Sequence, residues 1–285
     1  MTHADAFLQA IAENPDDDGL RLIFADWLEE QGQPRGEFIR TQCTLAGLEA
    51  DDRRRRALEA RERQLLERHR DEWLGPLRSL AYLWGFRRGF AEEVTLPAES
   101  FLDHADTFFR TTPLLLARLL NSAGDSRLEK LANSPHLGRL TALHLTDNRI
   151  GNAGLVTLLD AADLGRLTTL RLGNNELGDV GIKALAECPH LTGLTTLNLQ
   201  KNNIGNAGAY ALAMSPHLAG LTALFLGDNQ IGPAGAQALA ESPYLRRLET
   251  LELANSGGYS PYTNSIGPKH RGLLRERFGE GVCVF

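Results

Sequence analysis

Three histidines recur at one position of a repeated segment, and they are the first residues of this chain that could bind a metal. His136, His190 and His217 each follow a proline, and imidazole nitrogens are frequent ligands of zinc. However, neighbouring repeats offer only one such side chain each, and Asp163 interrupts the series. A structural zinc site needs four ligands close together. We therefore expect loop residues that were copied by duplication, and we predict no metal and no cofactor.

The second candidate for chemistry is a group of charged residues near the N-terminus: Arg21, Asp26, Glu37 and Arg40. Carboxylates can act as general acids or bases in hydrolases and transferases, but no serine or histidine nucleophile accompanies these. We expect ion pairs on helix surfaces around a core of Trp27 and Phe38, and no enzymatic activity. An exposed acid–base pair in a cleft beside Trp27 would favour catalysis instead, whereas burial of Trp27 against Phe38 would argue against it.

The three cysteines could supply a nucleophile or a disulfide. Cys43, Cys188 and Cys283 are far apart, odd in number and without a C-x-x-C spacing, which is typical of proteins in a reducing compartment. Cys188 stands where other repeats have serine. We therefore expect Cys188 to be a small buried residue and not a nucleophile.

Composition excludes several classes of partner. The 285 residues carry a formal net charge of −6, which gives no general attraction to nucleic acids or to anionic membranes. We find no basic region followed by an apolar run at the N-terminus, and no stretch that approaches the roughly 18 apolar residues of a membrane-spanning helix. We therefore expect a cytoplasmic protein that binds neither nucleic acid nor membrane.

The segment from Leu140 to Leu253 consists of repeats. Its first copy, L-T-A-L-H-L-T-D-N-R-I-G, recurs at a constant spacing of 27 residues from Leu167, Leu194 and Leu221, and in weaker form from Leu248. A fixed period in this range indicates a solenoid, in which each unit buries its apolar face against its neighbours.

The pattern L-x-x-L-x-L-x-x-N-x-I/L-G in these copies resembles the leucine-rich repeat, in the ribonuclease-inhibitor-like subtype that pairs each strand with a helix. The resemblance implies an α/β fold: a right-handed solenoid with a parallel sheet inside and helices outside. In this family the concave strand surface commonly binds another protein. The unit at residues 113–139 keeps the 27-residue register but places Arg118 where the third strand leucine belongs, as is typical of a terminal repeat.

Some positions of the repeat hold the same residue in all or most copies. Two leucine columns, which begin at Leu143 and Leu145, share one face of a strand and should point into the core. An asparagine column should satisfy the backbone where each strand ends, and it holds Asn148, Asn175, Asn202 and Asn229. Paired glycines such as Gly205 and Gly208 should let the chain turn and let the helix approach closely.

Other positions vary between copies, and these should face the open side of the sheet. The first column holds His144, Arg171, Asn198, Phe225 and Glu252. The next two hold Thr146, Gly173, Gln200, Gly227 and Ala254, and then Asp147, Asn174, Lys201, Asp228 and Asn255. A copied core with a diversified surface is what a recognition site would look like, with Phe225 as the first anchor candidate. The alternative is drift on an unconstrained surface.

The N-terminal part shows a second resemblance. Residues 14–30, N-P-D-D-D-G-L-R-L-I-F-A-D-W-L-E-E, and the later block R-G-E-F-I-R-T-Q at 35–42 resemble the bacterial repeat-companion domain, a module found before repeat arrays and without established activity. We predict helices here and over 51–72. The expected domains are residues 1–80, helical and capping, and residues 81–285, the solenoid with its C-terminal cap.

An insertion of about eight residues interrupts the last repeat after Asn255 and, being rich in glycine, proline and serine, should form a loop. Tyr259 and Tyr262 on this loop would suit a contact with a partner, although a tolerated insertion is the alternative. We predict a non-enzymatic protein-interaction module that binds an unidentified protein through its concave face. The main alternative is a structural, assembly or recruitment element without a specific ligand on that face.

Overall fold

The computed structural model describes residues 3–121, 125–161, 163–256 and 263–285. The chain forms two compact units, one of residues 1–96 with 103–117 and the other of residues 97–102 with 118–285. The boundary expected after residue 80 therefore falls inside the first unit. That residues 1–80 and 81–285 are separate domains stays a prediction.

The first unit begins with helices, as predicted, and continues with an antiparallel hairpin. Its elements are α1 (His3–Glu13), α2 (Asp18–Glu30), α3 (Arg35–Ala46), α4 (Arg55–Leu74), α5 (Leu77–Leu80), β1 (Leu83–Arg87), β2 (Phe90–Pro97) and most of α6 (Ala98–Thr111). The Asp17 carboxylate caps α2 by accepting a hydrogen bond from the Gly19 amide at 2.8 Å. Arg88 and Gly89, both at positive φ, form the hairpin turn.

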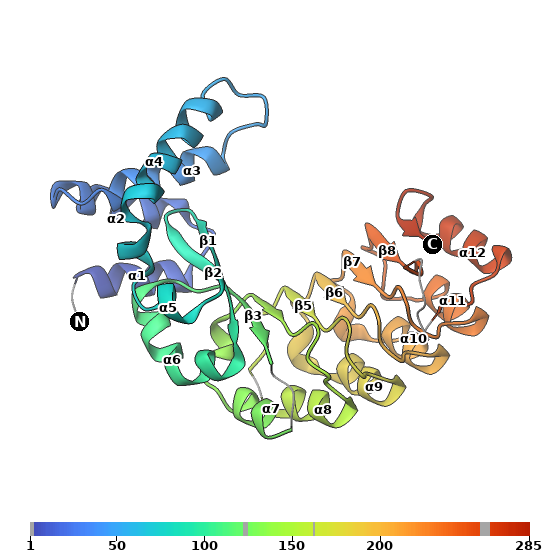
Figure 1. Ribbon diagram of the computed structural model, residues 1–285. Coiled ribbons are helices and arrows are strands. Elements are labelled where there is room, and N and C mark those ends of the chain that lie inside the picture. The colour runs from blue at the N-terminus through green and yellow to red at the C-terminus, as the bar shows by residue number, and fades with distance from the viewer. Residues whose placement is uncertain (1–2, 122–124, 162, 257–262) are drawn as a thin grey trace. The chain divides into compact units, whose positions relative to one another are not determined.

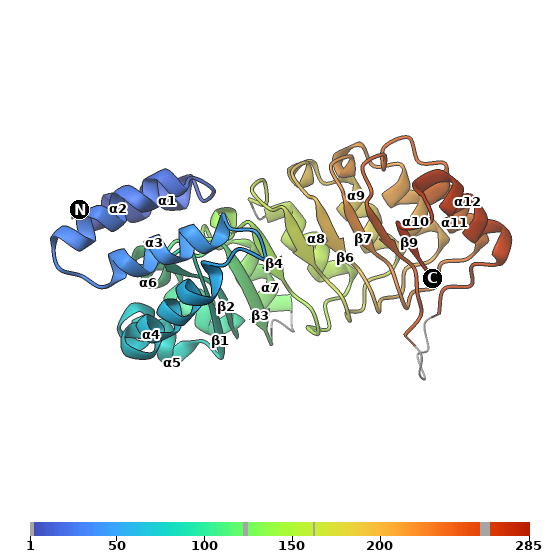
Figure 2. The ribbon, with the colours of Figure 1, turned by 90° about the horizontal axis from the view of Figure 1, so that it is seen from above.

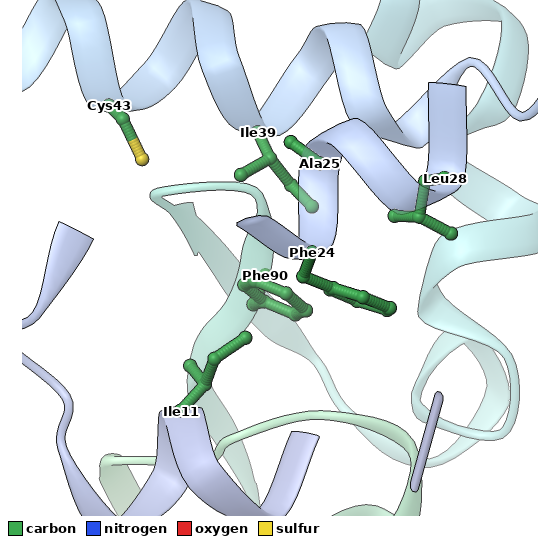
Figure 3. Close-up of a cluster of buried hydrophobic side chains, with 7 residues drawn as sticks. All are labelled: Ile11, Phe24, Ala25, Leu28, Ile39, Cys43 and Phe90. Atoms are coloured by element: carbon green, nitrogen blue, oxygen red, sulfur yellow. The ribbon is translucent and has the colours of Figure 1, made fainter. Parts of the chain in front are cut away.

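The hydrophobic core of the first unit consists of two clusters. One gathers Ile11, Phe24, Ala25, Leu28, Ile39, Cys43 and Phe90 (Figure 3). The other joins Phe38 to Trp73, with ring centroids 4.7 Å apart, and to Phe86. The predicted core of Trp27 against Phe38 is wrong, because Trp27 stacks on Phe24 of the first cluster, with ring centroids 5.9 Å apart. Adjacent residues of a helix point about 100° apart, so Phe38 and Ile39 of α3 enter different clusters.

The second unit is a parallel sheet whose strands alternate with helices. The paired strands are β4 (Ala142–His144), β5 (Thr169–Arg171), β6 (Thr196–Asn198), β7 (Ala223–Phe225), β8 (Thr250–Glu252) and β9 (Cys283–Val284). The helices are α7 (Asp125–Ala132), α8 (Asn152–Ala161), α9 (Asp179–Glu187), α10 (Asn206–Ala213), α11 (Pro233–Ala240) and α12 (Pro268–Phe278). Short 3₁₀ turns η1 (Leu137–Arg139), η2 (Pro189–Leu191) and η3 (Pro216–Leu218) lead into strands. Figures 1 and 2 show helices α8 to α11 along one side of this unit and strands β5 to β8 along the other. The predicted α/β solenoid is confirmed.

The two leucine columns form the core of the second unit. The column that begins at Leu143 is fully buried in every repeat through Leu251, and the column that begins at Leu145 is at most 2% exposed. Because close-packed cores relax little around a cavity, replacing one of these leucines with alanine should destabilise the unit by about 2–5 kcal/mol.

The asparagine column forms a hydrogen-bonded ladder, as predicted. Asn175 donates from Nδ2 to the carbonyls of Leu145 and Leu172, both at 2.9 Å, and its Oδ1 accepts from the Ile150 amide at 2.9 Å. Asn202 and Asn229 repeat these contacts one and two units on. Each side chain therefore satisfies buried backbone groups of two neighbouring repeats.

Asn264 is a further member of this ladder that the sequence analysis did not include. Its Nδ2 donates to the carbonyls of Leu226 and Leu253 at 2.9 and 3.0 Å, and its Oδ1 accepts from the Ile231 amide at 3.0 Å. The repeat spacing would place this asparagine eight positions earlier. The asparagine ladder therefore continues on the far side of the insertion.

A second ladder joins the starts of the helices and explains one glycine of each pair. The Asp179 Oδ1 atom accepts hydrogen bonds from the amides of Gly205 and Gly208 in the next repeat, at 2.7 and 2.9 Å. Asn152 and Asn206 make the equivalent contacts. A Cβ atom on Gly208 would lie 2.7 Å from that carboxylate oxygen. Glycine at this position lets neighbouring helices approach each other, as predicted.

Strand β3 (Leu116–Leu120) departs from the predicted register by one residue. Ala117 and Leu119 are buried, whereas Arg118 is exposed. Asn148 donates to the Leu119 carbonyl at 2.9 Å, which is the contact that Asn175 makes with Leu145. The expectation that Arg118 takes a core leucine position is wrong. The unit is one residue shorter than the repeat period, so the arginine faces the open side of the sheet.

Candidate functional site

The open side of the second unit displays one side chain from each strand in a single row. In the parallel register His144 lies beside Arg171, then Asn198, Phe225 and Glu252. Strands of a sheet lie about 4.8 Å apart, so the structure brings all these predicted residues together as neighbours. We call this row, with the exposed residues that follow it at the strand ends, the strand-side surface. Val284 of β9 extends the row beyond Glu252.

The strand ends carry the second set of predicted residues. These are Asp147, Asn174, Lys201 and Asp228, all with φ between 51° and 62°. Asparagine and aspartate tolerate this left-handed conformation better than other non-glycine residues, which accounts for their presence in most copies. Their backbone amides continue the parallel ladder, for example from Asn174 to the Gln200 carbonyl at 2.8 Å. The side chains are therefore set at regular steps along one edge of the strand-side surface.

The acidic side chains of this surface are engaged by neutral donors of the same chain. Asp147 accepts a hydrogen bond from the side-chain amide of Asn174. Glu252 accepts one from the side-chain amide of Gln200 at 2.6 Å. Asp228 is only 3% exposed, and it accepts from the amide and hydroxyl of Ser256 at 2.9 and 2.6 Å. Asp228 thus fixes the chain that leads into the insertion, and this burial argues against direct contact with a partner.

The basic side chains of the same surface have no such contacts. Within the described residues, Arg118, Arg171 and Lys201 make no ion pair and no side-chain hydrogen bond. They line a hollow of about 360 Å³, which we call the basic hollow. Its lining residues are Arg118, Leu120, Thr146, Asp147, Arg171, Gly173, Asn174, Asn198, Gln200 and Lys201. Three cations therefore surround this hollow against one carboxylate, that of Asp147.

His144 is buried beside Arg171 in the same row. The side chain is 5% exposed, and neither ring nitrogen finds a hydrogen-bond partner in the part of the chain that the structure describes. Burial, together with the nearby charges of Arg171 and Arg118, lowers the pKa of His144 to about 4. The imidazole is therefore neutral at pH 7, with one donor and one acceptor free.

The insertion begins and ends at a pair of asparagines. Asn255 donates to the Asn264 carbonyl at 3.1 Å, and the Asn264 amide donates back to the Asn255 side chain at 2.8 Å. These contacts join the two ends of the insertion. The predicted contact residues Tyr259 and Tyr262 lie outside the described residues.

The charged residues of the first unit form ion pairs, though only partly as predicted. Arg40 pairs with Asp26 and with Glu29, the latter at 3.2 Å, whereas Glu37 pairs with Arg61 of α4 through two contacts of 2.6 Å. The hydrogen bond from Arg61 lowers the pKa of Glu37. A carboxylate that is held ionised in this way is a poor general acid.

Arg21 is fully buried, so the prediction that places it on a helix surface is wrong. Its guanidinium lies 2.7 Å from the carboxylate of Glu92, which is 1% exposed, and donates to the Pro15 carbonyl at 2.8 Å. Burial raises the pKa of Glu92 to about 7, and the Arg21 charge opposes that rise. The pair links α2 to β2 inside the first unit.

The remaining candidates for chemistry are dispersed or buried. In residues 3–121, 125–161, 163–256 and 263–285, no three histidine, cysteine or acidic side chains are grouped as a metal site would require. Cys43, Cys188 and Cys283 are free and buried, and burial raises the pKa of each thiol, that of Cys43 to about 11. Thiols of this kind are poor nucleophiles, as expected for Cys188.

No described helix is both long and apolar enough to cross a membrane.

The helix side of the second unit carries a hollow that the sequence analysis did not predict. It has a volume of about 870 Å³ and lies along α9 and α10, with Val180, Tyr210 and Met214 among its lining residues. Val180 and Tyr210 are more than half exposed. Both residues vary between repeats, and that variation on the helix side was the only signal in the sequence.

Comparison with known proteins identifies the repeats. The protein-family model "Leucine Rich repeat" matches residues 140–159, 167–186, 188–213 and 220–240. No curated protein matches the chain. Similar solved structures include an internalin from Listeria monocytogenes, with a TM-score of 0.40 and 21% sequence identity. That similarity covers 62% of this chain and 42% of the internalin chain, which is less than half of the latter's length. No comparison concerns the N-terminal module, so its resemblance to the repeat-companion domain stays a prediction.

Proposed function

Because the chain is a leucine-rich repeat protein, we propose that it is a non-enzymatic protein-interaction module whose strand-side surface binds a partner protein. One observation supports this proposal above the others. Leucines that are almost completely buried flank a row in which each repeat contributes a different residue type: histidine, arginine, asparagine, phenylalanine and glutamate.

The row is suited to binding because its backbone is fixed. Each strand is held by leucines below and by the asparagine ladder at its end, so the exposed side chains sit on a rigid support. A rigid support lowers the entropy that is lost on binding. Half-buried Phe225 lies near the middle of the row, beside Asn198 and Glu252. A central aromatic flanked by polar groups is typical of the residues that dominate interface energies.

We also propose that residues 1–80 form a repeat-companion module without catalytic activity, and that the protein acts in the cytoplasm. The ion-paired carboxylates and the buried thiols support the first statement, and three free cysteines suit a reducing compartment.

The test is capture of a partner from lysate of the host cells. The bait proteins are the intact chain, the variant Phe225→Ala/Arg171→Ala, and a matched helix-side variant Tyr210→Ala/Lys183→Ala, which also removes one aromatic ring and one cation. Circular dichroism checks that all three are folded. We expect one protein to be captured by the intact chain and the helix-side variant and to be lost with the strand-side variant. Equal capture by all three baits, or capture by none, would refute the proposal.

A further inference from the structure

The charges of the strand-side surface are unequally satisfied. The carboxylates of Asp147 and Glu252 already accept hydrogen bonds from side-chain amides of the same chain. Arg118, Arg171 and Lys201 have no intramolecular partner among the described residues. Cations gain most from an external charge of opposite sign when no internal one competes for them. The surface as folded therefore has unused capacity for an anion, although its formal charges are mixed.

These cations also share one space. Arg118, Arg171 and Lys201, which come from β3, β5 and the end of β6, line the same hollow of about 360 Å³. The side-chain amides of Asn174, Asn198 and Gln200 line it too. Each donates one N–H to a neighbouring side chain and has a second N–H that can complete the hydrogen bonding of an oxyanion. Two arginines can bind carboxylates through paired N–H donors.

The buried imidazole of His144 supports the same conclusion. His144 lies within the electrostatic reach of both Arg118 and Arg171, and its ring nitrogens have no partner among the described residues. Asp147, the one carboxylate that lines the hollow, accepts a hydrogen bond from the Asn174 side chain and forms no ion pair with either guanidinium among the described residues. An anion bound over the two arginines would therefore reduce their mutual repulsion.

We infer that the basic hollow recognises an acidic segment of the partner protein, through carboxylates that pair with Arg118, Arg171 and Lys201. This inference rests on the proposed function and names the chemistry of the partner. The size of the hollow suits a few side chains and not a folded surface, so an extended stretch rich in glutamate or aspartate is the ligand that fits it. The net charge of −6 makes this local basic site selective, because the rest of the protein repels an acidic chain.

The test measures binding of a fluorescent octaglutamate peptide by anisotropy, with octaglutamine and inorganic phosphate as the other probes. One variant removes the three cations of the hollow, Arg118→Gln/Arg171→Gln/Lys201→Gln. A matched variant removes three exposed cations elsewhere in the second unit, Arg246→Gln/Arg247→Gln/Lys269→Gln. The two variants have the same net charge, so a difference between them reports position alone. Circular dichroism confirms the fold of each.

We expect octaglutamate to bind the intact chain and octaglutamine not to bind. The hollow variant should bind octaglutamate at least about tenfold more weakly than the intact chain, since three ion pairs are lost, and the matched variant should stay within about twofold. Equal loss in both variants, or no binding of octaglutamate to the intact chain, would overturn the inference. Binding of phosphate without binding of octaglutamate would also overturn it, in favour of a phosphate-bearing ligand.

The failure of this inference can be told apart from the failure of the proposed function. A partner that is captured from lysate and lost on Phe225→Ala alone, together with no binding of octaglutamate, would refute only the acidic chemistry. A captured partner that all strand-side variants retain would refute the proposed surface itself.

Discussion

His144 gives the sharpest quantitative prediction, because its burial makes stability depend on pH. The pKa of this imidazole is lowered to about 4 in the folded chain, first by burial and then by Arg171 and Arg118. An unfolded histidine titrates near 6.5. Between these values the unfolded chain binds a proton that the folded chain does not. The stabilising effect is therefore complete above about pH 6.5 and is lost as the pH falls toward 4. Linkage gives a loss of about 2 kcal/mol between pH 7.5 and pH 5.

The assay compares the intact chain with His144→Leu by urea unfolding at several values in this pH range. Far-UV circular dichroism is the signal to follow, because Trp27, Trp73 and Trp84 all lie in the first unit and their fluorescence would not report on the repeats. The leucine variant should lose about 2 kcal/mol less than the intact chain on acidification, and the other titrating groups cancel in the comparison. Parallel pH profiles for the two proteins would refute the reasoning.

Three further substitutions test the contacts that stabilise the two units. Asn202→Ala removes four side-chain hydrogen bonds to backbone groups and should lower the free energy of unfolding by about 3–5 kcal/mol, whereas exposed Asn133→Ala should cost less than about 1 kcal/mol. Gly208→Ala would place a methyl group 2.7 Å from two side-chain atoms and should lower stability by about 1–3 kcal/mol, as measured by thermal unfolding. Arg21→Ala leaves the buried Glu92 carboxylate unpaired and should cost about 3–5 kcal/mol, visible as an earlier urea transition in tryptophan fluorescence.

Each of these predictions has a contradicting result. Similar midpoints for the two asparagine variants would mean that the ladder contributes little. An unchanged melting temperature after the glycine substitution would mean that the helices can separate without cost. An unchanged fluorescence transition after the arginine substitution would mean that the buried ion pair is replaced by water.

The repeat array could be predicted because its motif occurs several times in the sequence at a constant spacing. A leucine that returns at a fixed spacing fixes the strand, its buried face and its register, and comparison of copies then separates core from surface. The first unit offers no such comparison. The error with Trp27 and Phe38 shows the consequence: the helical pattern identified both as core residues but could not say which of two clusters each one enters. That assignment depends on partners such as Trp73, which is far away in sequence.

The candidate site was predicted in its location but not in its chemistry. The sequence showed which residues share the row, and the variable columns contain both acidic and basic residues. It could not show that the acids are occupied by neighbouring amides, because Gln200 reaches Glu252 across two strands. Nor could it place Arg118 on the surface, since one residue missing before the first regular copy shifts that strand by a full side-chain face. Contacts between side chains of different repeats, and the register of an irregular strand, follow from the folded structure and not from the repeat pattern.

The most direct test of the central claim places a photo-crosslinking residue on each side of the second unit. Benzoylphenylalanine replaces Phe225 in one protein and Tyr210 in another, so each substitution exchanges one aromatic ring for a larger one. Both proteins are irradiated in host lysate. We predict a specific adduct with a partner protein from position 225 and none from position 210. An adduct from position 210 alone, or from neither position, would contradict the claim that the strand-side surface binds the partner.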